Sequence, residues 1–477
     1  MNEETMQSRT EKLGTQRISK LLISLAIPSI IAQIVNILYN MVDRIFVGRL
    51  PDGTAAMSAL SVALPIITFI LAVTQLFGIG GAPLAAIKLG ENNKKAAEKI
   101  LTNSFVTLLG SSVVLTALVL IFAEPMLKMF GADENNMQMA LEYITIYSVG
   151  TVFVQIAFGL NSYINTQGYA KFGMLTVIIG AVLNIILDPI FIFVFNMGVK
   201  GAALATIISQ CVSALWVLKF FFGPKSTIKI RREYLKPDIR IVGSICALGV
   251  SPFIMNATES FLQIAFNNQL ARYGGTMAVG SMAILISLYQ MINMPLQGLC
   301  QGAQPILSYN YGAKNMDRVR KTFKLLFVSC LGFSILGCGS IILFSGAFGR
   351  IFTSDPDMLR LVEWSLKVFL IGGMVFGAQI ACQQSFVALG QAKRSLMMAL
   401  FRKVILLIPL IFVMPELIGG SGFAAALSRP VADLCRDSGR VFAVLSAESI
   451  SDILAAVTTS ALFFTFYRKY LKTEKSL

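Results

Sequence analysis

The chain has 477 residues, of which 55% are hydrophobic and 14% charged, with a mean hydropathy of +0.72 and a formal net charge of +15. Soluble domains contain about a quarter charged residues, so this composition excludes a soluble globular protein and predicts an integral membrane protein. The chain contains no His, which excludes imidazole as a metal ligand, general base or proton relay. No Walker A run, Cys/His cluster or nucleophile–base pair is visible. We therefore expect neither an enzyme nor an ATP-driven pump, and no cofactor.

Apolar runs of about 20–30 residues, the length that crosses a bilayer as a helix, follow one another along the chain. We predict an all-α integral membrane protein with twelve transmembrane helices. The predicted spans are 20–46, 56–87, 101–122, 140–163, 173–195, 199–222, 241–270, 277–308, 322–345, 363–388, 396–414 and 441–467.

Lys and Arg residues flank these spans unevenly. With this topology, 29 of the 40 Lys and Arg residues lie on the side of the N-terminus, and seven of them lie in Lys219–Arg240. The positive-inside rule then predicts that both termini of this multi-pass protein are cytoplasmic. The basic residues form no continuous face, so we expect the lipid bilayer and no nucleic acid as a partner.

The second half of the chain repeats the first. A shift of 222 residues relates the pairs Gly80 and Gly302, Pro83 and Pro305, Gly90 and Gly312, Asn93 and Asn315, Gly150 and Gly372, and Gly168 and Gly390. A shift of 224 relates Pro28 to Pro252 and Asp43 to Asn267. We predict two pseudo-symmetric six-helix bundles, related by an axis along the membrane normal, with a cavity between them.

The repeat also predicts the boundaries. They are 1–19 for a cytoplasmic N-terminal segment, 20–222 for the first lobe, 223–240 for a basic cytoplasmic linker, 241–467 for the second lobe and 468–477 for a cytoplasmic tail. Residues 423–440 precede the last span; they resemble its start but end in a polar stretch, and we interpret them as an extra external segment.

The most informative motif is Asn184-Ile-Ile-Leu-Asp188-Pro189, which places an amide and a carboxylate on one face of an apolar helix. A carboxylate at that depth is costly and usually faces a cavity or a partner. Pro189 has no N–H, so the carbonyl of Ile185 loses its helical partner. A buried Asp that caps a neighbouring helix is the alternative, and we favour a functional site.

Polar stripes on other spans indicate a water-lined cavity, because polar side chains within lipid must face protein or water. The alternative is interhelical hydrogen bonding, but these spans carry four or five polar residues each. Methionines and a tyrosine near the stripes suit a wall for varied ligands, although plain packing explains them equally well. The predicted cavity residues are Gln33, Asn36, Asn40, Asn161, Asn165, Met255, Asn256, Glu259, Gln263, Tyr289, Met291, Asn293 and Gln297.

These motifs give the chain a family resemblance. It resembles the multidrug and toxic compound extrusion (MATE) transporters, and within them the MepA-like bacterial branch. The resemblance extends over the first eleven spans. It is carried by Pro28 through Asp43-Arg-Ile-Phe-Val-Gly48, Gly81-Ala-Pro83, Asn165-Thr-Gln-Gly168, Asn184-x-x-x-Asp188-Pro189 and Gly201-Ala-Ala-Leu-Ala-Thr206.

The resemblance implies a secondary active multidrug efflux antiporter in the inner membrane of a bacterial cell. It would exchange small organic cations and drugs for H⁺ or Na⁺ by alternating access, and we expect a monomer. The residues that match the family's cation site, and that would be metal ligands if Na⁺ is the coupling ion, are Asp43, Asn184, Asp188 and Thr206. Two carboxylates in such a pocket cannot both stay ionised without a counter-ion.

Another branch of the family uses a Glu in span 7 with an Asp in span 10. Glu259 matches the Glu, but span 10 offers Gln379, Gln383 and Gln384 and no Asp. We therefore expect Glu259 to face a cationic substrate or to titrate as a secondary site. Glu448 and Asp452 in the last span form either a buried pair or an interfacial face, and we assign them no role.

Two rival functions remain. A flippase for a lipid-linked precursor would need Arg or Lys in the cavity to hold pyrophosphate, and we expect no Arg or Lys in the middle of any span. An ion channel or receptor is disfavoured by the tandem halves and the closed acidic pocket.

Overall fold

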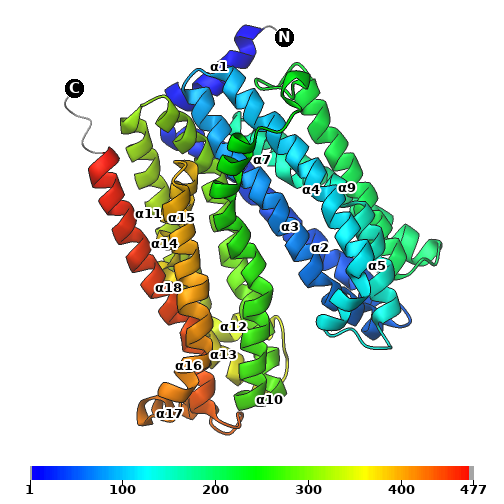
Figure 1. The fold of residues 1–477 in the computed structure, drawn as a ribbon. Coiled ribbons are helices and arrows are strands. Elements are labelled where there is room, and N and C mark those ends of the chain that lie inside the picture. The colour runs from blue at the N-terminus through cyan, green and yellow to red at the C-terminus, as the bar shows by residue number, and fades with distance from the viewer. Residues whose placement is uncertain (1–2, 472–477) are drawn as a thin grey trace. The chain divides into compact units, whose positions relative to one another are not determined.

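The computed structural model describes residues 3–471, in which helices are joined by short turns and no β-strand occurs (Figure 1). The helices of the first half are α1 (Glu3–Thr15), α2 (Ile18–Gly48), α3 (Gly53–Gly90), α4 (Lys94–Met129), α5 (Met137–Val149), α6 (Thr151–Val154), η1 (Gln155–Gly159), α7 (Leu160–Thr166), α8 (Ala170–Pro189), η2 (Ile190–Val194) and α9 (Val199–Phe222).

The second half begins after a linker that contains the short helix η3 (Arg232–Tyr234). Its helices are α10 (Ile239–Gly312), α11 (Met316–Leu343), α12 (Ser345–Arg350), α13 (Pro356–Leu370), α14 (Gly373–Ala388), α15 (Ala392–Leu400), η4 (Phe401–Leu407), α16 (Ile408–Leu417), α17 (Gly422–Ser428), η5 (Arg429–Val431), α18 (Ser438–Phe466) and η6 (Tyr467–Leu471).

The helices account for twelve membrane spans. Among residues 3–471, nine helices are long and apolar enough to cross a membrane, and two further spans are bent pairs with angles of 56° and 42°. The helix α10, at 74 residues, is two helices that meet at Gly275, where φ is 76° and ψ is −167°. Dividing α10 at this glycine gives the twelfth span. The predicted all-α fold with twelve spans is confirmed.

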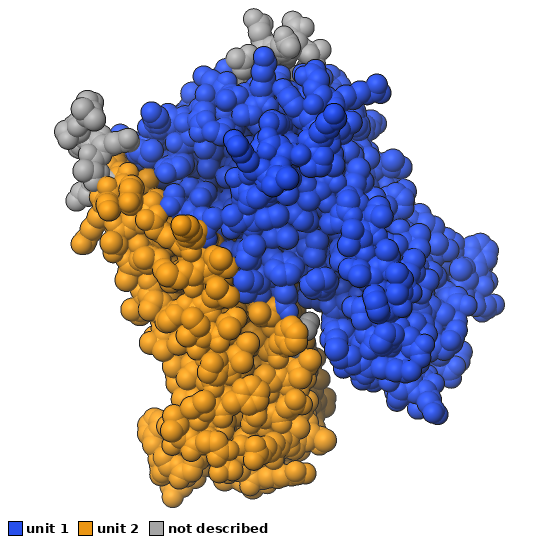
Figure 2. Space-filling view, in the orientation of Figure 1, with its two compact units in different colours: residues 1–257, 301–319, 387–392 blue, residues 258–300, 320–386, 393–477 orange. Residues whose placement is uncertain are grey.

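The chain divides into two compact units, drawn in different colours in Figure 2. Unit 1 contains residues 1–257, 301–319 and 387–392, and unit 2 contains residues 258–300, 320–386 and 393–477. The start and the end of α10 thus belong to unit 1. The predicted tail at 468–477 lies partly outside the described residues, as do Met1 and Asn2 of the N-terminal segment.

Repeated glycines explain how the start and end of α10 pack into unit 1. A Cβ on Gly80 of α3 would overlap the carbonyl oxygen of Ile245, and a Cβ on Gly302 would overlap the backbone of Ala26 on α2. Glycine is the residue that permits such close backbone approach. The repeat therefore preserves a pair of helix crossings, one for each half.

A second pair of repeated glycines marks the two bent spans. Gly150 lies between α5 and α6, and Gly372 lies between α13 and α14. A Cβ on Gly150 would overlap the side chain of Ile207 on α9, and a Cβ on Gly372 would overlap the backbone of Ser449 on α18. In each half, the bend brings the fourth span against the sixth.

The linker at 223–240 is fastened to unit 1 by polar contacts. The Oε1 atom of Gln167, at the end of α7, accepts hydrogen bonds from Thr227 N at 2.6 Å and from Ile228 N at 3.2 Å. The linker's Asp238 accepts a hydrogen bond from Lys99 Nζ of α4 at 2.7 Å, and it also caps α10 by accepting from Arg240 N.

The polar segment predicted at 423–440 packs on unit 2 as α17, η5 and the turn that precedes α18. Trp364 Nε1 of α13 donates to Leu427 O at 2.9 Å, and Asp437 N donates to Tyr273 O of α10 at 2.8 Å. An exposed ion pair of 2.6 Å joins Arg360 to Asp433. The segment thus lies at the end of unit 2 that carries the Gly275 turn, which is the outer end in the predicted topology.

Candidate functional site

Asn184 and Asp188 lie one turn apart on the same face of α8, as their spacing of four residues predicts. Asn184 Nδ2 donates to Asp188 Oδ1 at 3.1 Å. The Asp188 side chain is fully buried and Asn184 is 2% exposed. Pro189 follows directly, and the helix continues as the π-helical turn η2, an irregularity that often occurs at functional sites.

Neighbouring helices complete the group. The helix α8 packs against both α2 and α9, which carry Asp43 and Thr206. Asn184 Nδ2 also donates to Thr206 Oγ1 at 3.4 Å, and Thr206 Oγ1 donates to Ala202 O at 3.0 Å. The carboxyl groups of Asp43 and Asp188 lie within hydrogen-bonding reach of each other. All four residues matched from sequence therefore meet at one place in unit 1, which we call the acid-pair site.

The acid-pair site has more acceptors than donors. Within residues 3–471, neither carboxylate forms an ion pair with Lys or Arg; Arg44, beside Asp43 in the chain, is exposed and acts at longer range. Asp43 Oδ1, Asn184 Oδ1 and Asp188 Oδ2 are buried and accept no hydrogen bond from the described residues. Unpaired buried acceptors of this kind are costly, so the site is suited to take up a cation.

Two occupants match this chemistry. Two carboxyl groups in hydrogen-bonding contact are stabilised by one shared proton. Alternatively, the carboxylate, amide and hydroxyl oxygens suit a hard cation such as Na⁺. As the structure places it, Asn184 presents its N–H₂ group to Asp188 and Thr206, so Na⁺ would require the amide to rotate and present its oxygen.

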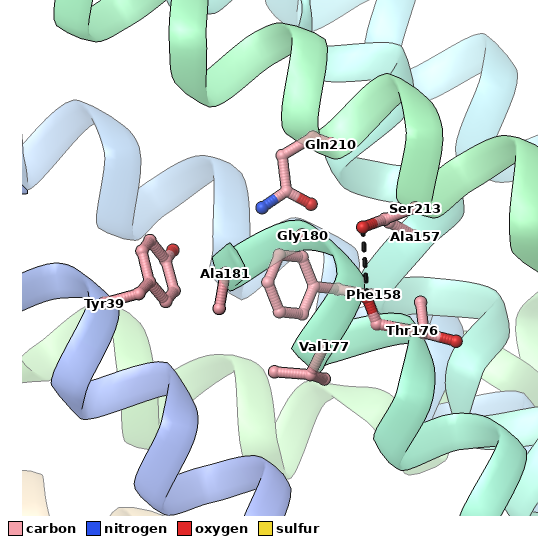
Figure 3. Close-up of a pocket in the computed structure, with 9 residues that line it drawn as sticks. All are labelled: Tyr39, Ala157, Phe158, Thr176, Val177, Gly180, Ala181, Gln210 and Ser213. Atoms are coloured by element: carbon pink, nitrogen blue, oxygen red, sulfur yellow. Dashed lines mark hydrogen bonds between the residues drawn. The ribbon is translucent and has the colours of Figure 1, made fainter. Parts of the chain in front are cut away.

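A small pocket, lined by α2, η1, α8 and α9, lies one helical turn from the acid-pair site (Figure 3). Tyr39 precedes Asp43 by four residues on α2, Gly180 precedes Asn184 by four on α8, and Gln210 follows Thr206 by four on α9. Because residues four apart share a helix face, the pocket continues the polar face of the site. The full lining is Tyr39, Ala157, Phe158, Thr176, Val177, Gly180, Ala181, Gln210 and Ser213.

The other cavity candidates of unit 1 have varied surroundings. On α2, Asn40 is exposed and its Nδ2 donates to Asn36 O at 2.6 Å, while Gln33 is half-buried. On α7, the Oδ1 atoms of Asn161 and Asn165 lie against Gly173 of α8, which is about 16 Å along the helix from Asn184.

On the first part of α10, Asn256 Nδ2 donates to Gln75 Oε1 of α3 at 2.8 Å, and Met255 is half-buried. Asn256 thus makes the interhelical contact that was the alternative to a cavity role, and Gln75 was not predicted.

The candidates of unit 2 lie along α10. Glu259, Gln263, Met291 and Gln297 are exposed, whereas Tyr289 and Asn293 are half-buried. Asn293 Oδ1 is buried and accepts no hydrogen bond from any residue that the structure describes. Tyr289 points inward, because its hydroxyl donates to Asp452 Oδ2 at 3.3 Å.

The prediction that no Arg or Lys lies in the middle of any span is wrong. Arg402 and Lys403 lie in η4, in the middle of the eleventh span, and are 3% and 6% exposed. Arg402 Nη2 lies 2.7 Å from Asp452 Oδ1 and 3.1 Å from Glu448 Oε1, and Lys403 Nζ lies 2.8 Å from Glu259 Oε2. We call these five residues the charged cluster. Glu448 and Asp452, to which we assigned no role, are thus a buried pair.

A signal for this cluster was present in the sequence. Two adjacent bases in an apolar run cannot remain buried without acidic partners, and Glu448 and Asp452 are spaced to supply them from one helix face. Each base finds its carboxylate inside unit 2.

Comparison with known proteins gives a consistent result. The MatE family profile matches residues 28–190 and 252–413, two stretches whose starts are separated by the same 224 residues as the sequence repeat. The chain is 26% identical over 404 residues to the multidrug export protein MepA of Staphylococcus aureus (strain MSSA476), covering 84% of this chain and 88% of MepA. It is 27% identical over 406 residues to MepA of Staphylococcus haemolyticus (strain JCSC1435), covering 85% and 89%.

Solved structures share the fold. A MATE protein crystallised in complex with MaL6 superimposes with a TM-score of 0.87 at 20% identity, covering 97% of this chain and 99% of that one. A transporter of the MOP superfamily from Pyrococcus furiosus, described as having a binding pocket of reversed polarity that suggests a different function, superimposes with a TM-score of 0.85 at 20% identity, covering 98% and 99%.

Proposed function

The chain belongs to the MatE family of multidrug and toxic compound extrusion transporters, and from that premise we propose that it is a secondary active antiporter that exports lipophilic organic cations. It exchanges each cation for H⁺ or Na⁺ by alternating access. It acts as a monomer in the inner membrane of a bacterial cell, with both termini in the cytoplasm. The relatives named as multidrug export proteins support this substrate class.

The observation that carries the proposal is the acid-pair site. Asp43 and Asp188 are in contact inside a membrane-spanning bundle and, within residues 3–471, neither forms an ion pair with a base. Such a pair binds a proton or a metal ion tightly when closed off from water. Asn184, which donates its N–H₂ group to Asp188, stabilises the ionised carboxylate that remains after either ion leaves.

Coupling follows if ion and substrate prefer different states of the transporter. An ion that enters from outside neutralises Asp43 and Asp188, which changes the packing of α2 against α8 and favours outward release of the substrate. Pro28 in α2 and Pro189 at the end of α8 ease this change, because each removes a backbone hydrogen bond from its helix. Release of the ion to the cytoplasm then restores the charged site.

A flippase for a lipid-linked precursor is the second candidate, and the buried Arg402 and Lys403 are the observation that favours it. A pyrophosphate site needs free positive charge, however. Both bases here are paired with carboxylates at 2.7–3.1 Å. The charged cluster contains three carboxyl groups and two bases, so the acidic groups are in excess, which supports a cationic substrate.

The direct test is efflux of ethidium from proteoliposomes in which the pH and Na⁺ gradients are imposed separately, for the wild type, Asp43→Asn and Asp188→Asn. We expect one gradient to drive efflux in the wild type and both variants to lose that dependence. Normal coupling in both variants would refute the role of the acid-pair site. If no cation moves under either gradient, the exporter proposal fails and the flippase becomes the better hypothesis.

A further inference from the structure

The charged cluster of unit 2 holds more negative than positive charge. Its carboxylates are Glu259 on α10 and Glu448 and Asp452 on α18, and its bases are Arg402 and Lys403 on η4. Three carboxylates thus face two bases, so the cluster lacks one positive charge. Buried charges are stable only when they are paired or neutralised, and this difference is met by one proton or by one monovalent cation.

The two bases differ in how firmly they are held. Arg402 donates to Asp452 Oδ1 from both Nε, at 3.0 Å, and Nη2, at 2.7 Å. It also bonds to Glu448, and its guanidinium lies 4.2 Å from the ring centroid of Phe376. Lys403, in contrast, makes one ion-pair contact within the part of the chain that the structure describes, at 2.8 Å to Glu259.

The pair formed by Lys403 and Glu259 is also asymmetric in exposure. The Lys403 side chain is 8% exposed, whereas that of Glu259 is 51% exposed. A carboxylate in a membrane span is expected to face water or protein, because facing lipid is costly. The exposed part of the Glu259 carboxylate is therefore where a dissolved cation would meet the pair.

Lys403 also has a second carboxylate to which it can turn. Glu448 interacts electrostatically with both Lys403 and Glu259, and it shares Arg402 with Asp452. The lysine ammonium ends a flexible four-carbon stem and keeps its charge in any orientation. Moving from Glu259 to Glu448 would leave Lys403 paired and Glu259 free.

We propose that Lys403 is a tethered competitor that occupies Glu259 in the absence of substrate, and that a lipophilic monovalent cation binds by taking over Glu259 while Lys403 turns to Glu448. This inference rests on the proposed export of organic cations and adds a specificity-determining residue to it. The exchange ends with three carboxylates facing three positive charges, so the cluster prefers a monocation to a dication.

The test is binding of tetraphenylphosphonium to the full chain in detergent micelles, measured by isothermal titration calorimetry. Lys403→Met and Lys403→Gln remove the competitor and should tighten binding by about tenfold, the equivalent of 1.4 kcal/mol. Glu259→Gln should weaken binding, and Lys403→Met should give no gain when combined with it. Arg360→Met, which removes an exposed positive charge of unit 2 outside the cluster, is the matched control and should bind as the wild type does.

The outcomes of these binding measurements distinguish failure of the competitor role of Lys403 from failure of the proposed cation export. Unchanged or weaker binding by both Lys403 variants, with thermal unfolding like that of the wild type, overturns the competitor role while leaving cation export intact. A gain that persists in the Glu259→Gln background overturns it as well, because the gain then does not act through Glu259. If neither the wild type nor any variant binds the cation, the proposed function itself fails. Binding that appears only when Lys403 is removed supports the inference.

Discussion

The acid-pair site of unit 1 and the charged cluster of unit 2 lie in two halves that share a repeated fold, but they differ in how their buried carboxyl groups are neutralised. In unit 1, Asp43 and Asp188 meet without a paired base in the described residues. In unit 2, the two bases Arg402 and Lys403 come from within the fold. With the shift of 222 residues that relates the halves, Arg402 and Lys403 correspond in sequence to Gly180 and Ala181. These two residues line the pocket beside the acid-pair site.

The comparison indicates that unit 1 binds the coupling ion and that the charged cluster of unit 2 has a different role. A site whose carboxylates are already paired with Arg or Lys either stabilises the fold or selects among cations. An incoming cation must displace the Arg or Lys side chain from its carboxylate before it can bind. A site whose carboxylates lack a partner takes its cation from solution, which is what a coupling ion requires. The same reasoning predicts that equivalent substitutions have opposite effects in the two units.

The largest effect is expected from Arg402→Met. The substitution leaves Glu448 and Asp452 buried at 5% and 0% exposure without their shared base, and breaking a buried ion pair costs about 3–5 kcal/mol. Thermal unfolding of the purified protein in detergent should show a large loss. The matched control is Arg360→Met, which breaks an exposed pair of 2.6 Å and should cost about 0.2–1 kcal/mol. Equal losses of thermal stability in the two variants would mean that the buried ion pairs of the cluster contribute no more stability than an exposed ion pair.

Asp188→Asn should act in the opposite direction. The amide keeps an acceptor for Asn184 and adds a donor toward Asp43, and satisfying an unpaired buried polar group is worth about 1–3 kcal/mol. We therefore expect the variant to unfold at a higher temperature than the wild type while losing ion-coupled efflux. Asp452→Asn, the same exchange in unit 2, should unfold at a lower temperature. Destabilisation by both exchanges would remove the proposed difference between the units.

A smaller effect is expected from Thr206→Val, which keeps the shape of the side chain but removes the hydroxyl that Asn184 contacts at 3.4 Å. Loss of one hydrogen bond costs about 0.5–1.5 kcal/mol. We expect the rate of gradient-driven efflux to fall by about 2- to 10-fold, and Thr206→Ser to restore it. Full activity of Thr206→Val would show that the threonine hydroxyl contributes nothing to ion coupling.

The smallest effect is expected at the linker, outside the spans. The Lys99 ammonium, 2.7 Å from Asp238, lowers the pKa of that carboxyl, with help from the backbone N–H of Arg240. Because the pKa is lowered in the folded protein, the pair stabilises the fold above the ordinary pKa of about 3.9. That contribution is lost as the pH falls through the lowered value.

Asp238→Asn keeps an oxygen to cap α10 but has no carboxyl group to titrate. The variant should therefore lose less stability than the wild type as the pH falls. The check is thermal unfolding between about pH 6 and about pH 3. An unaltered pH profile would show that this half-buried pair, unlike the charged cluster, contributes no measurable stability.

Much of the fold follows from sequence because each span is a long apolar run and the halves share their glycines. Gly275 shows where such reasoning reaches its limit, since the two spans predicted at 241–270 and 277–308 are joined directly at one non-helical residue rather than by a polar loop. The acid-pair site was also predictable, because Asn184 and Asp188 share a helix face and the family resemblance adds Asp43 and Thr206.

The charged cluster was not predicted, although its members were visible. Arg402 and Lys403 stand in an apolar run, and only the packing of η4 against α18 shows that Glu448 and Asp452 neutralise Arg402. Asn256 is a similar case, because its partner Gln75 lies 181 residues away in the chain. Hydropathy and spacing identify a polar side chain within a span, but the identity of its partner depends on tertiary packing.

The measurement that tests the central claim most directly is the number of protons released when tetraphenylphosphonium binds to the protein in weakly buffered detergent solution without Na⁺. Since two carboxyl groups in contact share a single proton, we predict release of about one proton per bound cation by the wild type and by Glu448→Gln. We predict none from Asp188→Asn. Undiminished release from Asp188→Asn, or its loss from Glu448→Gln alone, would contradict the assignment of the coupling ion to unit 1.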